Sequence, residues 1–163
     1  MSLLNICRIC IYLISYYGGW LCENIYYLGH SGVVNFGELK IMGISGILNE
    51  RFYKCGYFEE HPYSHLDKKS VYCTREYEIA KCCLYSKPID IIFSHDWPSN
   101  VYSMDSLKDV LFYKPFWKKD VLTKHLGNKH LDVVLETLKP KLWVSAHLHA
   151  FFTNKVGPTE YNN

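Results

Sequence analysis

The sequence contains none of the common nucleotide-binding and hydrolase motifs: the P-loop, GxGxxG, GxSxG and HExxH are all absent. Their absence excludes a Walker-type phosphate loop, a dinucleotide-binding turn, a serine nucleophile elbow and a zincin helix. No internal repeat is present either.

A long apolar run and a second CxxC motif are also missing. The apolar run at residues 9–17 is about half of the roughly 20 residues that cross a bilayer, and Arg8 without a following cleavage site argues against a signal peptide. Of seven cysteines, Cys7 and Cys10 alone form a CxxC, which is too little for a zinc ribbon or a disulfide framework. Free thiols in a reducing compartment, the cytosol or the nucleus, are expected.

The chain lacks a strong net charge as well. A formal charge of +2 does not by itself indicate a nucleic-acid-binding protein. Basic residues outnumber acidic ones between residues 108 and 141, where Lys118 and Lys119 follow Phe116 and Trp117, and a solvated helix face is the simplest interpretation of that stretch. With 163 residues, 48% of them hydrophobic, the sequence suits one globular domain.

What the sequence does contain is an alternation of short strands and helices, which predicts an α/β fold with helices covering a sheet. Glycine-broken stretches at residues 24–29 and 32–47 predict a β-meander. Tyr77, Ala80 and Leu84 have the spacing of one helix side. Further elements are predicted at 89–94 (a fully buried strand), 115–123 and 129–138 (helices) and 142–149 (a buried strand). Residues 48–70 form a loop too long for an ordinary connection, which favours a functional role.

Three histidines follow the two predicted buried strands. His95 comes directly after residues 89–94, and His147 and His149 stand in an HxH pattern whose rings point to one side of an extended chain. Because ligands gather at the carboxyl ends of parallel strands, a metal site is predicted there. The three rings suit either one catalytic zinc with an open water position or half of a two-metal site. Asp96 is interpreted as a supporting or capping residue.

Six stretches resemble one family over about residues 5–152: YYGGW, NIYYLGHSGVVNFG, SGI, SVYCTREYE, PIDIIFSHDWP and LKPKLWVSAHLH. Together they are similar to the RNA lariat debranching enzymes, which are calcineurin-like metallophosphoesterases. The combination of SHDWP with SAHLH is the most specific part. The resemblance implies part of a β-sandwich flanked by helices.

The same resemblance implies a nuclear hydrolase of mRNA processing, with the cytoplasm as a second compartment, that cuts the 2′,5′-phosphodiester of branched lariat intron RNA. A divalent metal, Mn²⁺, Fe²⁺ or Zn²⁺, is implied, with His95 and His147 in one metal position and His149 in the other. No membrane association is implied. Residues 48–70 correspond to a lariat-recognition loop, and the implied RNA contacts are Tyr63, His65, Tyr72 and Arg75.

The sequence departs from the family pattern at its beginning. Asn5 stands at the position of a metal-binding Asn, but Ile6 replaces the His expected as general acid and Cys7 replaces a Glu. The family's xxH motif and bridging Asp are not found. Residues 1–163 are therefore expected to form a single incomplete domain whose first metal-binding half is missing, with an exposed apolar sheet face, low solubility and weak metal binding.

Three hypotheses follow. The first is a debranching phosphodiesterase with little or no activity in this chain. The second is a catalytically inactive RNA-binding remnant that uses the loop and the basic stretch. The third is a structural zinc protein in which a cysteine such as Cys10 or Cys22 joins the three histidines.

Overall fold

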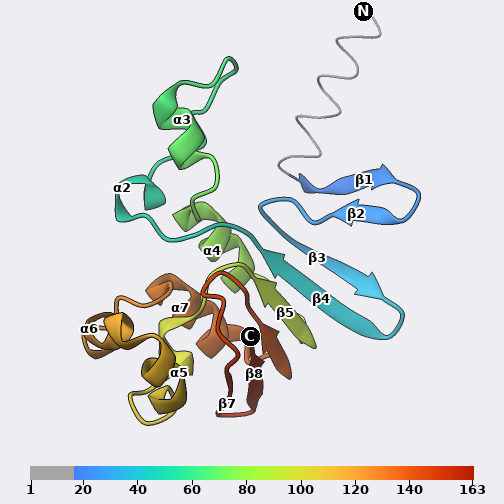
Figure 1. Ribbon diagram of the computed structural model, residues 1–163. Coiled ribbons are helices and arrows are strands. Elements are labelled where there is room, and N and C mark those ends of the chain that lie inside the picture. The colour runs from blue at the N-terminus through green and yellow to red at the C-terminus, as the bar shows by residue number, and fades with distance from the viewer. Residues whose placement is uncertain (1–16) are drawn as a thin grey trace, which may run out of the picture.

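A computed structural model describes residues 17–163 (Figure 1). Asn5, Ile6, Cys7 and Cys10 lie outside these residues. The described chain forms a two-stranded sheet, β1-β2, and a six-stranded sheet with the order β3-β4-β5-β6-β8-β7. The strands are β1 (Gly19–Cys22), β2 (Ile25–Tyr27), β3 (Ser31–Phe36), β4 (Leu39–Ile44), β5 (Ile91–Ser94), β6 (Leu142–Val144), β7 (Thr153–Val156) and β8 (Thr159–Asn162).

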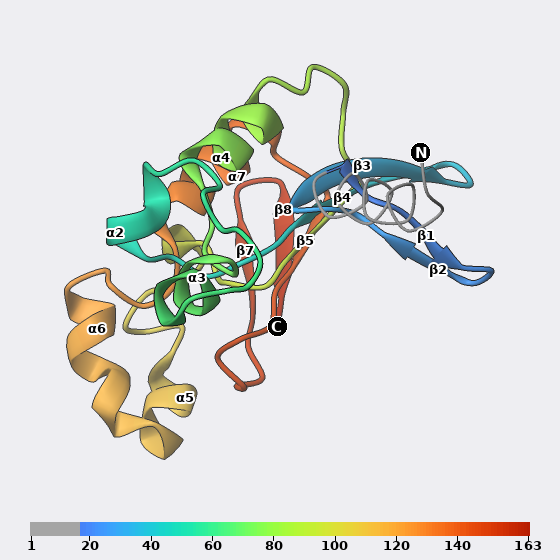
Figure 2. The same cartoon turned by 90° about the horizontal axis from the view of Figure 1, so that it is seen from above.

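The helices are α2 (Glu50–Tyr53), α3 (His65–Ser70), α4 (Glu76–Cys83), α5 (Lys108–Tyr113), α6 (Lys118–Leu122) and α7 (Lys129–Leu138), with short 3-10 turns η1 (Ser99–Val101) and η2 (Pro115–Trp117). Figure 2 shows α4 and α7 on one side of the large sheet and the β1-β2 hairpin toward the other. The predicted α/β class is confirmed. No helix within residues 17–163 is long and apolar enough to cross a bilayer.

The centre of the large sheet is parallel. β4, β5, β6 and β8 run in one direction, and the edge strands β3 and β7 are antiparallel to their neighbours. Met42, Ile92, Trp143 and Tyr161 lie side by side across these four strands and are all buried, so they form the floor of the core under α4 and α7. Neighbouring parallel strands need a crossover connection. The connections from β4 to β5 and from β5 to β6 contain the helices, and the connection from β6 to β8 contains β7.

Helix α7 has the bounds that the sequence predicts. The Asn128 side chain caps its start by accepting from the His130 backbone N–H at 3.0 Å. Leu131, Val134 and Leu135 form the buried stripe. At its end Lys139 takes a left-handed backbone before Pro140, which cannot continue a helix.

The predicted β-meander is wrong, because β2 does not pair with β3. After β2 the chain crosses the sheet face, and the Leu28 side chain packs where Gly43 has none. A Cβ at position 43 would lie 2.6 Å from the Leu28 Cδ1 atom. Gly43 therefore makes room for a crossing segment, and β1-β2 becomes a separate sheet.

Helix α4 exists as predicted, but its buried side is a different one. Tyr77 and Leu84 are exposed, Leu84 at 83%, whereas Glu78, Ile79 and Cys82 are buried. Glu78 faces inward because its carboxylate has partners there: it accepts hydrogen bonds from the Ser31 and Tyr57 hydroxyls. An apolar pattern alone could not show this, since the pattern takes charged residues to be exposed.

Strand β5 is buried on one face only, so the prediction of a fully buried strand is wrong. Ile92 and Ser94 face the helices, while Phe93 on the other face is 44% exposed. Half-buried neighbours continue this second face: Val34, Ile41, Ile91, Leu142 and Val144. Ile92 packs with the core residues of the helices, whereas the face of Phe93 is only partly covered, with the Leu28 segment lying over Gly43.

Residues 48–70, predicted as a loop, contain the two short helices α2 and α3. Ser64 and Asp67 form a capping box that starts α3. The predicted helix at 115–123 is divided into η2 and α6, and α5 precedes it. The five cysteines in the described range are free, as expected.

Candidate functional site

His95 and His147 meet at the carboxyl edge of the parallel strands. Phe93 and Val144 are paired across β5 and β6, so the residues that follow them leave the sheet side by side. The His95 Nε2 and His147 Nδ1 atoms are 3.0 Å apart, and the two rings are nearly perpendicular. The structure thus brings together two of the three predicted histidines, through strand register.

Backbone contacts fix this pair. The Ala146 N–H donates to the His95 carbonyl at 3.1 Å, and the indole N–H of buried Trp97 donates to the Ala146 carbonyl at 2.8 Å. Beneath them the buried Ser94 and Ser145 hydroxyls are 2.9 Å apart. The SHDWP and SAHLH segments are therefore held to each other as one unit.

The HxH segment is not extended, so the extended backbone from which the side of the two rings was predicted is wrong. β6 ends at Val144, and His147 and His149 both have left-handed backbones, with φ of 66° and 49°. Such conformations are uncommon for residues with a Cβ and concentrate at functional sites. His147 turns toward His95, and the exposed His149 lines a hollow with Tyr113 and Phe151 instead.

Lys114 holds this turn and was not predicted. Its Nζ donates to the Leu148 carbonyl at 2.6 Å and to the His149 carbonyl at 2.9 Å, and it lies 4.3 Å from the centre of the Trp117 ring. Ammonium groups and aromatic faces attract one another. A lysine 34 residues away in sequence from its acceptor leaves no local signal of such a role.

The electrostatics favour a neutral His95. Burial lowers the pKa of His95, the nearby His147 and His149 lower it further, and Asp96 opposes them. Neutral imidazole is the form that binds a metal or accepts a proton.

Asp96 supports the site through hydrogen bonds to the backbone. Its buried carboxylate accepts from the backbone N–H groups of Leu48, at 3.2 Å, and Trp97, at 3.0 Å, and burial raises its pKa. It therefore connects the segment after β4 to the end of β5, in line with its interpretation as a supporting residue.

The donor atoms of His95 and His147 fit two neighbouring positions of one metal ion. Two metal–nitrogen bonds of about 2.1 Å that meet at a right angle, as in octahedral coordination, place the nitrogens about 3.0 Å apart, which is the observed separation. The tetrahedral angle of zinc would place them about 3.4 Å apart. Among residues 17–163 no group of three or more His, Cys, Asp or Glu side chains is arranged to hold a metal. The described part thus supplies a pair of ligand atoms, and the role of His149 stays a prediction.

Three of the four predicted RNA contacts are accessible. His65 and Tyr72 line one cavity of about 550 Å³ together with Arg51 and Lys69, two cations that sequence reasoning did not single out. Tyr63 is exposed in the same loop. Cationic side chains beside exposed rings suit a phosphate backbone and its bases.

Arg75, the fourth, is corrected by the structure, because only 1% of this residue is exposed. Its guanidinium donates to the Phe52 carbonyl at 2.7 Å and the Ser70 carbonyl at 3.0 Å, and it forms an ion pair with Glu59. The rings of Tyr57, Phe58 and Phe52 surround it. Arg75 thus holds the loop from inside and does not present its charge to a ligand.

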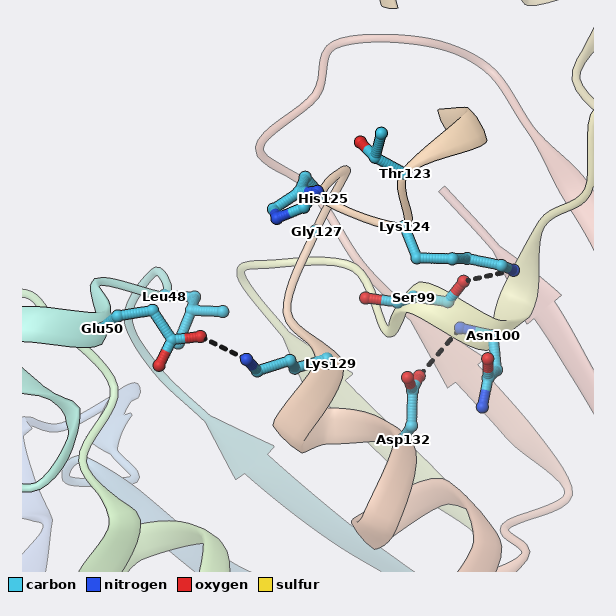
Figure 3. A pocket seen from close by; sticks show the side chains of 10 residues that line it. All are labelled: Leu48, Glu50, Ser99, Asn100, Thr123, Lys124, His125, Gly127, Lys129 and Asp132. Carbon is cyan, nitrogen blue, oxygen red and sulfur yellow. Dashed lines mark hydrogen bonds and ion pairs between the residues drawn. The ribbon is translucent and has the colours of Figure 1, made fainter. Parts of the chain in front are cut away.

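A second cavity, of about 510 Å³, adjoins the site (Figure 3). Leu48, whose N–H donates to Asp96, forms part of its wall. Its cations already have partners: Lys129 pairs with Glu50 at 2.6 Å, and Lys124 donates to the Ser99 carbonyl at 3.4 Å. The balanced charge makes this cavity less suited to a polyanion than the cavity beside Tyr72.

Comparisons with known proteins give one consistent result. No protein-family model matches the chain. Curated relatives named lariat debranching enzyme are 44% identical over 141 residues in Arabidopsis thaliana, 44% over 137 in Schizosaccharomyces pombe and 43% over 136 in Homo sapiens. These matches cover 86%, 84% and 83% of this chain, but only 34%, 30% and 25% of the relatives. The chain spans about a quarter to a third of their length.

Proposed function

We propose that this chain carries part of a phosphodiesterase site for lariat debranching, the hydrolysis of the 2′,5′-phosphodiester at the branch point of intron RNA in the nucleus. The observation that carries the proposal is the 3.0 Å contact between His95 and His147, at the edge of a parallel sheet where ligands collect. The relatives named lariat debranching enzyme, 40–44% identical to this chain, support the same function.

A divalent metal, Mn²⁺, Fe²⁺ or Zn²⁺, would lower the pKa of a bound water and neutralise phosphate charge when bound. His95 and His147 would hold it, and Asn5 and His149 are the further ligands that we propose. Lys114 keeps the histidine turn in place through two carbonyls. Because isoleucine cannot transfer a proton, Ile6 leaves the general acid unassigned.

The test is incubation of the purified chain with a branched RNA and each metal in turn. Metal-dependent release of linear product, lost in His147→Ala, would support the proposal. His125→Ala is the matched control, because His125 is exposed and lines the separate cavity of Figure 3. Isothermal titration with Zn²⁺ gives a second readout: His147→Ala should weaken binding at least tenfold, and His125→Ala should not. Equal zinc affinity in both variants would contradict the assigned ligands.

A catalytically inactive RNA-binding protein is the second candidate. It is favoured by the shortage of a third ligand within residues 17–163 and by the cations around the Tyr72 cavity. In that case branched RNA would bind without cleavage under every metal, and Lys69→Ala would reduce both the affinity and its salt dependence.

A structural zinc protein has less support. Cys22 is exposed on β1 and joins no group of metal-binding side chains in the described range. Elemental analysis that finds one tightly held zinc, lost on replacement of Cys10, would favour this function over the other two.

A further inference from the structure

The hollow beside His149 is a separate feature from the histidine pair and from the Tyr72 cavity. It has a volume of about 340 Å³. Its walls come from α5, from Lys114 and from the segment after the histidine turn: Asp109, Val110, Tyr113, Lys114, His149, Ala150 and Phe151. His95 and His147 do not line it, whereas Lys114 and His149, which the proposed function uses, form part of its wall.

Aromatic side chains stand at this hollow with most of their surface in solvent. Tyr113 is 81% exposed and Phe151 is 85% exposed, and both line it. Phe112 lies edge-on against Tyr113, with ring centres 5.1 Å apart, and is also exposed. Exposed rings gathered around a concavity mark a binding surface, whereas single exposed rings do not.

The segment that carries Tyr113 is basic. Residues 108–124 contain five lysines and two aspartates, a net charge of +3, and Lys114 and Asp109 of this segment line the hollow. Aromatic platforms combined with cations are the means by which proteins bind single-stranded nucleic acid, because every base has a face that stacks.

We propose that this hollow binds one unpaired nucleobase of a single-stranded RNA, stacked on Phe151 or Tyr113. The inference rests on the proposed function, since the RNA is the strand whose phosphodiester would lie at His147. The Asp109 carboxylate in the wall is an acceptor for the amino group of a base.

The hollow lies next to the histidine turn. Lys114 lines it and binds the Leu148 and His149 carbonyls, so the wall and the histidine turn form one unit. A base held in the hollow would fix the adjoining sugar and phosphate relative to His147, two residues away. Positioning of a reacting bond is a large part of what an enzyme site contributes.

The experiment measures fluorescence anisotropy of a labelled, unbranched oligoribonucleotide in EDTA, beside an abasic ribose-phosphate oligomer of equal length. The variants are Phe151→Ala, Phe151→Trp and Phe36→Ala. Phe36 is the matched control, since it is 74% exposed at the turn between β3 and β4, far from α5 (Figure 1).

Phe151→Ala should weaken binding of the base-bearing RNA by roughly 5- to 100-fold, the range for loss of one stacked base. Phe151→Trp should restore it, and Phe36→Ala should change it by less than about twofold. Binding of the abasic oligomer should be equal in all variants.

Unchanged RNA affinity in Phe151→Ala, or an equal loss for the abasic oligomer, would overturn the inference. If Phe151→Ala instead lowers self-association in sedimentation velocity while RNA affinity stays the same, the hollow is an interface between copies and the base site is wrong. The assay contains neither metal nor branch, so its result is separable from debranching. If the chain debranches RNA but Phe151→Ala does not change RNA affinity, the base site is wrong and the proposed function still stands.

Discussion

Two irregular segments are each held by one cation that donates to two backbone carbonyls. Arg75 holds residues 52–70 through the Phe52 and Ser70 carbonyls. Lys114 holds the histidine turn through the Leu148 and His149 carbonyls. The two cations use the same donor chemistry in different parts of the fold.

Arg75 and Lys114 differ in their burial and in whether an acidic side chain neutralises their charge. Arg75 is out of solvent and is ion-paired with Glu59, whose side chain is also buried. Lys114 is half-buried and lies over the Trp117 ring. Removal of a buried partner leaves an uncompensated charge, whereas water can replace a half-exposed one. We infer that residues 52–70 unfold together with the core, whereas the histidine turn can open locally without it.

The largest effect should come from Arg75→Met. This change removes the loop's internal donor and leaves the Glu59 carboxylate buried without a partner, so the free energy of unfolding should fall by about 3–5 kcal/mol. Urea denaturation followed by tryptophan fluorescence measures it.

Arg51→Met is the matched control, because Arg51 also lies near the Phe52 ring, at 5.5 Å, but is exposed. Its cost should stay within about 0.5 kcal/mol. A cost below about 1 kcal/mol for Arg75→Met would mean that the loop does not depend on its guanidinium, and the contrast with Lys114 would disappear.

The comparison also shows how far the sequence reaches. The two predicted strands and their parallel arrangement were enough to bring His95 and His147 together, because strand ends in one sheet share an edge. Helix α7 was predicted with its bounds, since its cap, apolar stripe and Pro140 are local signals.

The roles of Arg75 and Lys114 could not be predicted for a different reason. Both side chains donate to backbone carbonyls, which every residue has, so the type of the acceptor residue gives no signal. The segments that contain these carbonyls also lack a regular apolar pattern. Arg75 was predicted as an RNA contact from the family resemblance, and arginine is rarely buried unless it is paired, so nothing in the sequence around it indicated an internal role. The left-handed backbone at His147 and His149 could not be predicted either, because the turn is held by Lys114, which is distant in the sequence.

An intermediate effect should come from Asp132→Asn. Asp132 is a buried charge that accepts from the Asn100 N–H at 2.8 Å, and burial raises its pKa to about 6. Because the folded state holds this proton more tightly than the unfolded state, the carboxyl's contribution to stability is present below pH 3.8 and is lost as pH rises through 6.

Asparagine keeps the acceptor and cannot ionise. We therefore expect Asp132→Asn to raise the free energy of unfolding at pH 7.5 by about 1–3 kcal/mol and to have little effect at pH 4. Urea curves at both values measure this. An equal effect at pH 4 and pH 7.5 would show that ionisation is not the cause.

The smallest effect, and the sharpest test of the contrast, should come from Lys114→Met. Charged hydrogen bonds contribute about 1.5–3 kcal/mol when buried, and partial exposure reduces this to about 1 kcal/mol. Because the methionine stem still packs on Trp117, the change should appear as faster amide hydrogen exchange at residues 146–150 with little change elsewhere. Lys118→Met, on an exposed neighbour, controls for lost charge and should leave those amides unaffected. A global loss as large as that of Arg75→Met would place the histidine turn inside the cooperative fold, and the two cations would then be equivalent.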